Sequence, residues 1–198
     1  MKSIIYLATK NKNKVKEIRE ILGEKTELKI ESCPENITFP EETGKDFKEN
    51  ACLKAKYLSK FLKGKLVAGE DSGLIVKTLG GLPGINSARF AGKECDDKKN
   101  INKLLHLMSQ YIKNEDRKAK FITVICLITP EETKKFQGEI EGNITFSPRG
   151  QNGFGYDPVF EIPFYSSKTF AELSQKEKNK ISHRTIAFNK LADYLLKR

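Results

Sequence analysis

The sequence predicts an α/β domain in which helices flank a mixed β-sheet, and three observations support this class. Residues 121–128 are apolar and rich in β-branched side chains, as expected of a central strand covered on both faces. Apolar residues recur at helical spacing in several other segments. Strand and helix patterns are mixed along the whole chain. Because 198 residues are enough for one sizeable core, we expect a single domain over residues 1–198.

The first quarter of the chain predicts two strands with a helix between them. Ser3 to Thr9 form an opening strand, a second strand lies near residues 28–30, and residues 34–45 form a loop. The helix ends at Gly23. Its apolar side consists of Val15, Ile18, Ile21 and Leu22.

A second helix begins with the spacing of a capping box. Asp46 is the expected N-cap, and Glu49 lies three residues further on. The apolar side of this helix continues to Leu62, and Gly64 ends it. Beyond it, residues 66–68 and 74–76 predict two short strands joined by the segment Gly69-Glu70-Asp71-Ser72-Gly73.

The second half of the chain follows the same alternation. A glycine-rich loop over residues 79–92 precedes a helix with Ile101, Leu104, Leu105, Met108 and Ile112 on its apolar side. After the central strand we expect strands near residues 134–140 and 144–146, and then a loop holding Gly150, Gly153 and Gly155. The last helix runs from about His183 to Leu196, with Ala187, Leu191 and Leu195 facing inward.

The chain is strongly basic: 36 Lys and Arg against 26 Asp and Glu leave a net charge of +10. Such a surplus attracts nucleic acid, acidic membrane or phosphorylated small molecules. The lysines are equally consistent with a solvated surface that has no anionic partner. Charge alone therefore does not choose between these classes.

The sequence also indicates a cellular compartment. The longest apolar stretch is far shorter than the roughly 20 residues needed to cross a bilayer, and the first residues show no signal peptide. The four cysteines, Cys33, Cys52, Cys95 and Cys126, form no CxxC pair, and no His lies at ligand spacing from them. We expect reduced thiols, no zinc site and a cytoplasmic protein.

The loop from Thr9 to Lys14 is the first segment with chemical potential. A strand that ends in a polar turn before a helix directs backbone N–H groups and the positive end of the helix dipole at a ligand. Thr9 and Asn11 add polar groups, and Lys14 adds a point charge for phosphate. No Walker motif occurs in the chain. The alternative is an ordinary connection between a strand and a helix.

Acidic residues form the second segment. Glu41 and Glu42 precede Gly44, and Glu70 and Asp71 follow further on. Mg²⁺ prefers one or two carboxylates together with phosphate oxygens and water, and it activates a bound water. A bound metal would also explain why carboxylates cluster. The alternative is that residues 70–73 form a plain hairpin turn.

Two further segments suit the recognition of a nucleotide. Glycines on both sides of Phe154 let the backbone approach a ligand, Phe154 and Tyr156 offer faces for stacking, and Asp157 can accept a hydrogen bond from a purine. A tight turn anchored by aromatic packing is the alternative. Ser182 suits an N-cap, which places His183 and Arg184 in the first turn of the last helix.

Cations in the first turn oppose the helix dipole, so a bound anion or carbonyl would explain this pair. The alternative is a surface His-Arg pair without function.

Together these segments resemble the inosine triphosphatase-like family, whose bacterial members are XTP/dITP diphosphatases. The matching segments occur in family order over nearly the whole chain: LATKN…K (7–14), EETG…ENA…KA (41–55), EDSGL (70–74), LGGLPG…SAR (79–89), GFGYDP (153–158) and AEL…EK…ISHR (171–184).

This resemblance implies an elongated two-lobed fold with the active site in a cleft between the lobes, and a homodimer. It implies hydrolysis of ITP, dITP and XTP between the α- and β-phosphates, giving nucleoside monophosphate and pyrophosphate. Mg²⁺ is the implied cofactor, with Mn²⁺ as a substitute. No stable nucleic-acid partner and no membrane are implied.

The resemblance also assigns roles by position. Asp71 is the proton acceptor that activates water and contacts the metal, with Glu41 and Glu70 as further metal ligands. The substrate-binding positions are Thr9, Asn11, Lys14, Ser72, Phe154, Gly155, Tyr156, Asp157, Lys178, His183 and Arg184. Two residues depart from the family pattern: Lys10 stands where Gly is usual, and Glu70 where Asp is common.

Other functions remain open alternatives at this point. The charge is also compatible with a nucleic-acid-binding module, although the basic residues form no single block. A pyrophosphatase of the same superfamily that acts on other modified nucleotides is a second alternative. A magnesium phosphatase that releases orthophosphate is a third.

Overall fold

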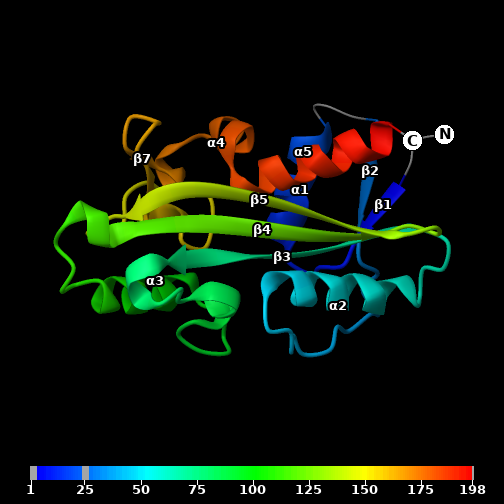
Figure 1. Cartoon of the computed structure of the whole chain (residues 1–198), viewed down its shortest axis with the longest axis horizontal. Helices are drawn as coiled ribbons and strands as arrows, with labels where there is room; N and C mark the ends of the chain where they lie inside the picture. Colours follow the sequence, from blue (N-terminus) through cyan, green and yellow to red (C-terminus); the bar gives the residue numbers. More distant parts are fainter. Residues whose placement is uncertain (1–3, 24–26, 198) are drawn as a thin grey trace. The chain divides into compact units, whose positions relative to one another are not determined.

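The computed structural model describes residues 4–23 and 27–197 (Figure 1), so Ser3 of the first predicted strand lies outside it. Seven strands form one sheet in the order β2-β1-β3-β4-β5-β6-β7. They are β1 (Ile4–Leu7), β2 (Lys29–Ser32), β3 (Leu66–Val76), β4 (Lys118–Ile128), β5 (Thr133–Ile144), β6 (Phe160–Ile162) and β7 (Lys168–Thr169). The α-helices are α1 (Lys12–Gly23), α2 (Phe47–Ser59), α3 (Asp97–Leu107), α4 (Gln175–Ile181) and α5 (His183–Leu196).

The sheet is mixed. β1 runs parallel to β2 and β3, whereas β6 runs antiparallel to β5 and β7. The predicted α/β class with a mixed sheet and flanking helices is therefore confirmed.

The chain divides into two compact units. Unit 1 comprises Met1–Asp71, Thr123–Gly138 and His183–Arg198, and unit 2 comprises Ser72–Ile122 and Glu139–Ser182. The long strands β3, β4 and β5 each have residues in both units. The single domain expected over residues 1–198 stays a prediction.

Unit 1 has its own apolar core. The core is formed by β1, the inward sides of α1 and α5, and the unit 1 parts of β3 and β4. In Figure 1, α1 and α5 lie on one side of these strands and α2 lies on the other. The predicted inward residues Ile18 and Leu22 of α1 and Leu191 of α5 are fully buried.

Two glycines let helices of unit 1 lie directly on its strands. A Cβ atom at Gly69 of β3 would stand 2.0 Å from the Ala51 carbonyl oxygen of α2. A Cβ atom at Gly138 of β5 would stand 2.1 Å from the His183 carbonyl oxygen of α5. Both contacts exclude any larger residue, and they set how closely α2 and α5 bring their side chains to the sheet.

Unit 2 has a separate core built from aromatic residues. The rings of Phe121, Phe160 and Phe170 pack against one another with centroid distances of 4.5–5.9 Å. Ile101, Leu104 and Met108, three of the inward residues predicted for the third helix, belong to this core. The fourth inward residue, Leu105, is partly buried against it.

The hairpin turn, which was the alternative given for residues 70–73, is not formed. β3 is one continuous strand, and Glu70 and Asp71 lie within it. The two strands predicted near residues 134–140 and 144–146 are likewise one strand, β5, which ends at Ile144. Both β3 and β5 lie inside the sheet with a neighbouring strand on each side, and this sheet context overrides the local turn preference of Asp, Ser and Gly.

Helix starts agree with the sequence better than helix ends. The Asp46 carboxylate caps α2 by accepting the Glu49 N–H at 2.8 Å, and α5 begins at His183 as expected. However, α2 ends at Ser59 and does not reach Leu62. Ile112 lies beyond the end of α3 and is 75% exposed.

Three short elements, β6, β7 and α4, were not predicted. The Ser174…Glu177 spacing is the capping box of α4 and is the signal that identifies this helix.

Candidate active site

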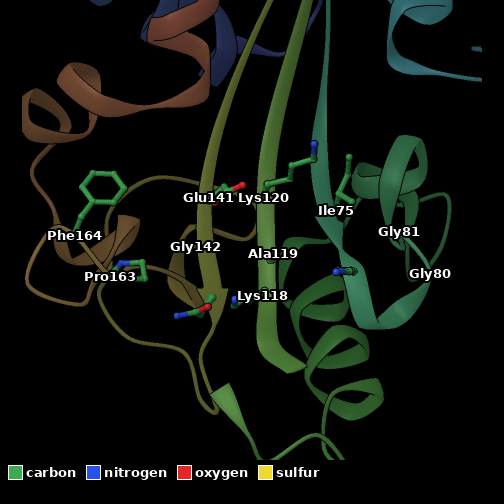
Figure 2. Close-up of a pocket in the computed structure, with 12 residues that line it drawn as sticks. Ile75, Gly80, Gly81, Lys118, Ala119, Lys120, Glu141, Gly142, Pro163 and Phe164 are labelled. Atoms are coloured by element: carbon green, nitrogen blue, oxygen red, sulfur yellow. The ribbon is translucent and has the colours of Figure 1, made fainter. Parts of the chain in front are cut away.

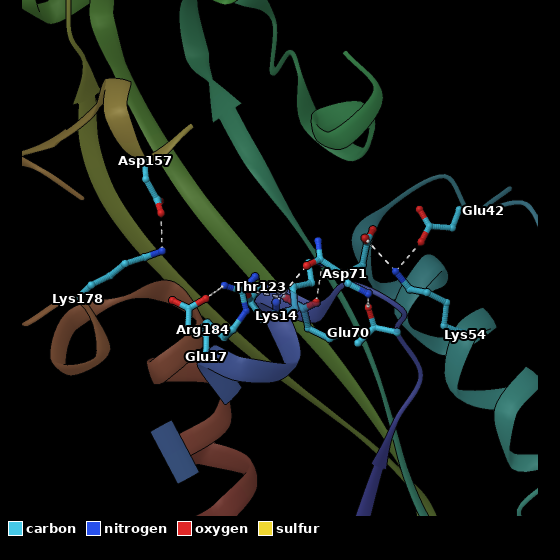
Figure 3. Close-up of polar contacts among 12 residues, drawn as sticks. Lys14, Glu17, Glu42, Lys54, Glu70, Asp71, Thr123, Asp157, Lys178 and Arg184 are labelled. Carbon is cyan, nitrogen blue, oxygen red and sulfur yellow. Dashed lines mark hydrogen bonds and ion pairs between the residues drawn. The ribbon is translucent and has the colours of Figure 1, made fainter. Parts of the chain in front are cut away.

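The two acidic residues of β3 point to opposite sides of the strand, because side chains alternate along a strand. The Glu70 carboxylate contacts residues of α1, α5 and β4. The Asp71 carboxylate contacts residues of α2. Figure 3 shows these two sets of contacts, which divide the site of unit 1 into two clusters.

The Glu70 cluster is a buried ion-pair network. Lys14 Nζ lies 2.7 Å from Glu70 Oε2, and Arg184 Nη2 lies 3.1 Å from Oε1. The Thr123 hydroxyl is 3.4 Å from the same Oε1. Burial by itself would raise the pKa of Glu70, but Lys14 and Arg184 outweigh it and hold this pKa well below its usual range. Glu70 is therefore ionised at neutral pH.

Arg184 is held between two carboxylates. It is 2% exposed, and its guanidinium forms an ion pair with Glu17 of α1 in addition to Glu70. Burial would lower the pKa of Arg184, but Glu17 and Glu70 together raise it. The predicted position of Arg184 in the first turn of α5 is confirmed, and two buried acids compensate its charge there.

Glu17 is not among the site residues predicted from the sequence. The signal was available, because Glu17 lies three residues after Lys14 and four before the buried Ile21 of α1. An acidic residue next to the apolar side of a helix requires a partner.

The Asp71 cluster is organised by α2. Lys54 Nζ lies 3.2 Å from Asp71 Oδ1 and 2.6 Å from Glu42 Oε1. The Asn50 amide donates to Asp71 Oδ2 at 3.2 Å, and its own oxygen accepts the Gly44 N–H at 2.8 Å. Asn50 and Lys54 are four residues apart and lie on one side of α2. This spacing, present in the ENA…KA segment, is the signal that identifies them.

The Asp71 carboxyl group differs electrostatically from that of Glu70. Burial raises the pKa of Asp71 above its ordinary value, and the Lys54 ammonium only partly opposes this. Burial would lower the pKa of Lys54, but Asp71 and Glu42 outweigh it and raise this pKa. Asp71 is thus the better proton acceptor of the two acids of β3.

The residues of this cluster fit a magnesium site with few protein ligands. Among residues 4–23 and 27–197, no three His, Cys, Asp or Glu side chains form a metal-binding group. Glu42 and Asp71 nevertheless converge on one cation, the Lys54 ammonium, and Mg²⁺ is commonly held by one or two carboxylates plus phosphate oxygens. Glu41 is exposed, and it is Glu42 that contacts Lys54. The assignments of Glu41 and Glu70 to the metal stay predictions.

The Thr9 to Lys14 loop is shaped by its own polar side chains. The Thr9 hydroxyl accepts the Asn11 N–H at 3.1 Å, and the Asn11 side chain accepts the Lys14 N–H at 3.1 Å. Lys10, the departure from the family pattern, donates to the Glu35 carbonyl at 3.3 Å. Lys14 is the residue of this loop that reaches Glu70. The triphosphate-binding roles of Thr9 and Asn11 stay predictions.

In unit 2 the predicted nucleotide-binding loop is built around Asp157. Its Oδ2 accepts hydrogen bonds from Lys178 Nζ at 2.6 Å and from the Phe154 N–H at 2.9 Å (Figure 3). Lys178 Nζ also lies 4.9 Å from the centroid of the Phe154 ring. The Gly155 N–H donates to Asp97 of α3 at 2.7 Å. The structure thus brings Phe154, Gly155, Asp157 and Lys178 together.

Tyr156 has a packing role. It is 4% exposed in the core of unit 2, and its hydroxyl donates to the Ser87 carbonyl at 2.9 Å. Burial raises the pKa of this hydroxyl. A stacking role for Tyr156 is not supported by this position, whereas Phe154 is only half-buried. Ser72 is half-buried on β3, and His183 is buried at the start of α5.

Unit 2 also contains a cavity of about 840 Å³, shown in Figure 2. Lys118, Lys120, Glu141 and Phe164 are among the residues that line it, and no predicted site residue does. A second cavity, of about 560 Å³, lies in unit 1, and Thr9, Lys12, Lys16 and Glu35 are among the residues that line it. The cavity of Figure 2 is therefore separate from the residues predicted to form the active site.

Two further expectations concern the chain as a whole. All four cysteines are free thiols, as expected. No helix in the described part of the chain is long and apolar enough to cross a membrane.

Comparisons with known proteins identify relatives of this chain. The Ham1 family model matches residues 5–194. A Bacillus licheniformis protein named dITP/XTP pyrophosphatase is 47% identical over 98% of this chain and 98% of its own length. The structure is similar to that of the Staphylococcus aureus Ham1 protein, with a TM-score of 0.85 and 39% identity over 98% of this chain and 99% of the other. A HAM1 protein from Coxiella burnetii gives a TM-score of 0.87 and 38% identity over 99% and 100%.

Proposed function

Because this chain belongs to the Ham1 family, we propose that it is a dITP/XTP pyrophosphatase that removes deaminated purine nucleotides from the nucleotide pool. It hydrolyses dITP, XTP and ITP to the nucleoside monophosphate and pyrophosphate. The observation that carries the proposal is the buried Asp71 carboxylate, which meets Glu42 across the Lys54 ammonium. This arrangement provides both a proton acceptor and a cation site.

Asp71 acts as the general base. A base works best when its pKa lies near the working pH, and burial moves the pKa of Asp71 upward from the ordinary Asp value. Glu70 is unsuited to this role because Lys14 and Arg184 stabilise its ionised form. The two acids of β3 therefore have different roles: Asp71 accepts the proton, and Glu70 holds Lys14 and Arg184 in place.

The reaction requires Mg²⁺, with Mn²⁺ as a substitute. Glu42 and Asp71 would hold the ion through their carboxylates. When bound, Mg²⁺ lowers the pKa of a coordinated water and offsets negative charge on the phosphoryl group. Lys14 and Lys54 supply further positive charge for the triphosphate, and Asn50 keeps the Asp71 carboxylate in its orientation.

Selectivity for 6-keto purines follows from hydrogen-bond donors of the protein that are directed at O6 of the base. A 6-keto purine offers an acceptor where adenine offers a donor, so donors from His183 or the backbone aimed at O6 would remain unpaired against adenine. Sites built on such matching discriminate by roughly 10⁴-fold or more. The roles of Phe154, Gly155, Asp157 and Lys178 in recognising the base, and that of Ser72 in binding phosphate, follow from the family resemblance and stay predictions.

The proposal is tested with a panel of nucleotides. Purified protein is incubated with Mg²⁺ and ITP, XTP, dITP, GTP, ATP or CTP, and products are separated by phosphorus NMR and ion-exchange chromatography. We expect ITP to give IMP and pyrophosphate much faster than ATP gives AMP. Release of orthophosphate, or equal use of all six nucleotides, would contradict the proposal. Omission of divalent metal is expected to stop turnover.

The base assignment is tested by Asp71→Asn, with Asp193→Asn as the matched control. Asp193 lies exposed on α5, so its variant should retain full activity. Asp71→Asn keeps the shape of the side chain but cannot accept the proton, and we expect loss of turnover with a retained fold by circular dichroism. An active Asp71→Asn enzyme would show that another group is the base.

The expected homodimer, cytoplasmic location and lack of a stable nucleic-acid partner complete the proposal. Light scattering tests the homodimer directly.

A further inference from the structure

We propose that the Lys54 ammonium occupies the position of Mg²⁺ in the metal-free protein, so that Lys54 and the metal displace one another at Glu42 and Asp71. The inference rests on the metal dependence proposed above, and it concerns how that site is loaded.

The contacts of Lys54 are those expected of a bound cation. Its Nζ atom joins two carboxylates that come from different segments, at 2.6 Å from Glu42 Oε1 and 3.2 Å from Asp71 Oδ1. The Lys54 side chain is only 11% exposed, and that of Asp71 is 8% exposed. A buried carboxylate, Asp71, and a half-buried one, Glu42, share this cation, and carboxylates are also the donors that suit Mg²⁺.

The same contacts keep the proposed base in a resting state. Lys54 occupies Asp71 Oδ1, and the Asn50 amide occupies Oδ2 at 3.2 Å. Both oxygens of Asp71 therefore already accept hydrogen bonds in the metal-free protein. Lys54 therefore competes for Oδ1 with a metal ion and with a proton from water.

Simultaneous occupation of this position is electrostatically unfavourable. A divalent ion on the same two oxygens would stand against the ammonium, and like charges at such short range repel strongly in a poorly solvated site. Lysine carries its charge on a flexible four-carbon side chain, so the ammonium can leave while α2 stays in place. It follows that free metal binds weakly, and that an anion able to receive the ammonium favours loading.

Metal affinity tests the exchange directly. Mn²⁺ is titrated into the protein without nucleotide, and free Mn²⁺ is measured by electron paramagnetic resonance. Lys54→Met removes the competing charge at similar length, so we expect the Kd for Mn²⁺ to fall by about tenfold or more. Lys54→Arg keeps the charge and should bind Mn²⁺ no more tightly than the wild-type protein does. Lys56→Met, at an exposed position of the same helix, is the matched control and should leave the Kd unchanged.

A double variant tests whether the gain in Mn²⁺ affinity arises at Asp71. Asp71→Asn combined with Lys54→Met should lose the gain in affinity, because the tighter site requires the Asp71 carboxylate. A folded Lys54→Met protein whose Kd for Mn²⁺ is unchanged or higher would overturn the proposal.

A second measurement uses the wild-type protein and does not depend on the folding of a variant. Lysines are acetylated briefly with an N-hydroxysuccinimide ester at increasing Mg²⁺ concentration, and each site is quantified by mass spectrometry. Displacement by the metal should increase the labelling of Lys54 and leave that of Lys56 unchanged. Labelling of Lys54 that stays constant or falls with Mg²⁺ would overturn the proposal.

Neither readout requires turnover, so the two proposals fail separately. A protein that shows the Lys54 exchange but cleaves none of the nucleotides contradicts only the proposed function. A protein that cleaves ITP but shows no exchange contradicts only this inference.

Discussion

At the scale of single residues, the site of unit 1 depends on which charges share a cluster. Glu70 meets two cations, Lys14 and Arg184, whereas Asp71 shares its one cation with Glu42. The first arrangement lowers the pKa of Glu70, and the second leaves burial free to raise that of Asp71. The pKa values of these two neighbouring acids therefore shift in opposite directions, because the charged residues around them differ.

Glu70→Gln should destabilise the fold in a pH-dependent way. It removes the carboxylate that pairs with Lys14 and one of the two carboxylates that pair with Arg184, and breaking a buried ion pair typically costs about 3–5 kcal/mol. Because the pKa of Glu70 is lowered on folding, its stabilising contribution is complete above its ordinary pKa of about 4.3 and is lost as pH falls further. Urea unfolding at pH 7 and at pH 3.5 should show a larger difference between wild type and variant at pH 7. A difference that stays constant with pH would contradict this account.

The aromatic residues of the 153–158 loop should separate binding from packing. Phe154→Ala should raise the KM for ITP by the equivalent of about 1–3 kcal/mol, the usual value of stacking on a base. Tyr156→Phe removes the hydrogen bond to the Ser87 carbonyl and should lower the free energy of unfolding by about 1–3 kcal/mol with KM unchanged. Steady-state kinetics and urea unfolding of both variants provide the measurement. The reverse pattern would assign stacking to Tyr156.

At the scale of elements, close approach of helices to strands positions the charged residues. α5 lies on β5 at Gly138, and α5 carries Arg184 into contact with Glu70. α2 lies on β3 at Gly69, and α2 carries Lys54 and Asn50 to Asp71. Each cluster therefore depends on a glycine that is itself outside the chemistry.

Gly138→Ala should displace α5 and weaken the Glu70 cluster. The added Cβ would meet the His183 carbonyl and the Ala187 nitrogen, and overpacking of this kind costs about 1–3 kcal/mol. Gly23→Ala at the end of α1 is the matched control, because a Cβ there meets nothing within 4 Å, and it should stay within about 0.5 kcal/mol of wild type. Thermal unfolding of both variants measures the difference. Equal stabilities would show that α5 adjusts without cost.

At the scale of the whole molecule, two apolar cores coexist in one chain of 198 residues. β3, β4 and β5 contribute residues to both units. We expect these shared strands to make unfolding a single cooperative transition, with equal calorimetric and van't Hoff enthalpies. Two resolved transitions in calorimetry would contradict the single-domain prediction.

The net charge of +10 should increase the rate at which the protein associates with its triphosphate substrate. Added salt screens the attraction between a basic protein and a triphosphate, since the Debye length falls from about 10 Å at 0.1 M to about 3 Å at 1 M. We therefore expect kcat/KM for ITP to fall as KCl is added, while kcat changes little. Rates that are independent of salt would assign the surplus lysines to a solvated surface.

Much of the fold was predictable because its signals are local. The apolar sides of α1 and α5, the Asp46 cap of α2 and the buried strand at residues 121–128 each depend on neighbours a few residues away. The polar segments around Lys14, Asp71, Asp157 and Arg184 were found for the same reason. The amino-acid sequence by itself therefore determined the fold class, and it located the polar segments in which site residues were predicted.

The tertiary structure alone decided how those residues pair. Residues 70–73 have the composition of a turn, but in the folded chain they are part of the continuous strand β3, which lies inside the sheet between β1 and β4. Glu42, rather than its neighbour Glu41, meets Lys54, and Glu17 meets Arg184 from the other end of the chain. Ion pairs and strand pairs form between residues that are distant in the chain, so their energies do not appear in any local pattern.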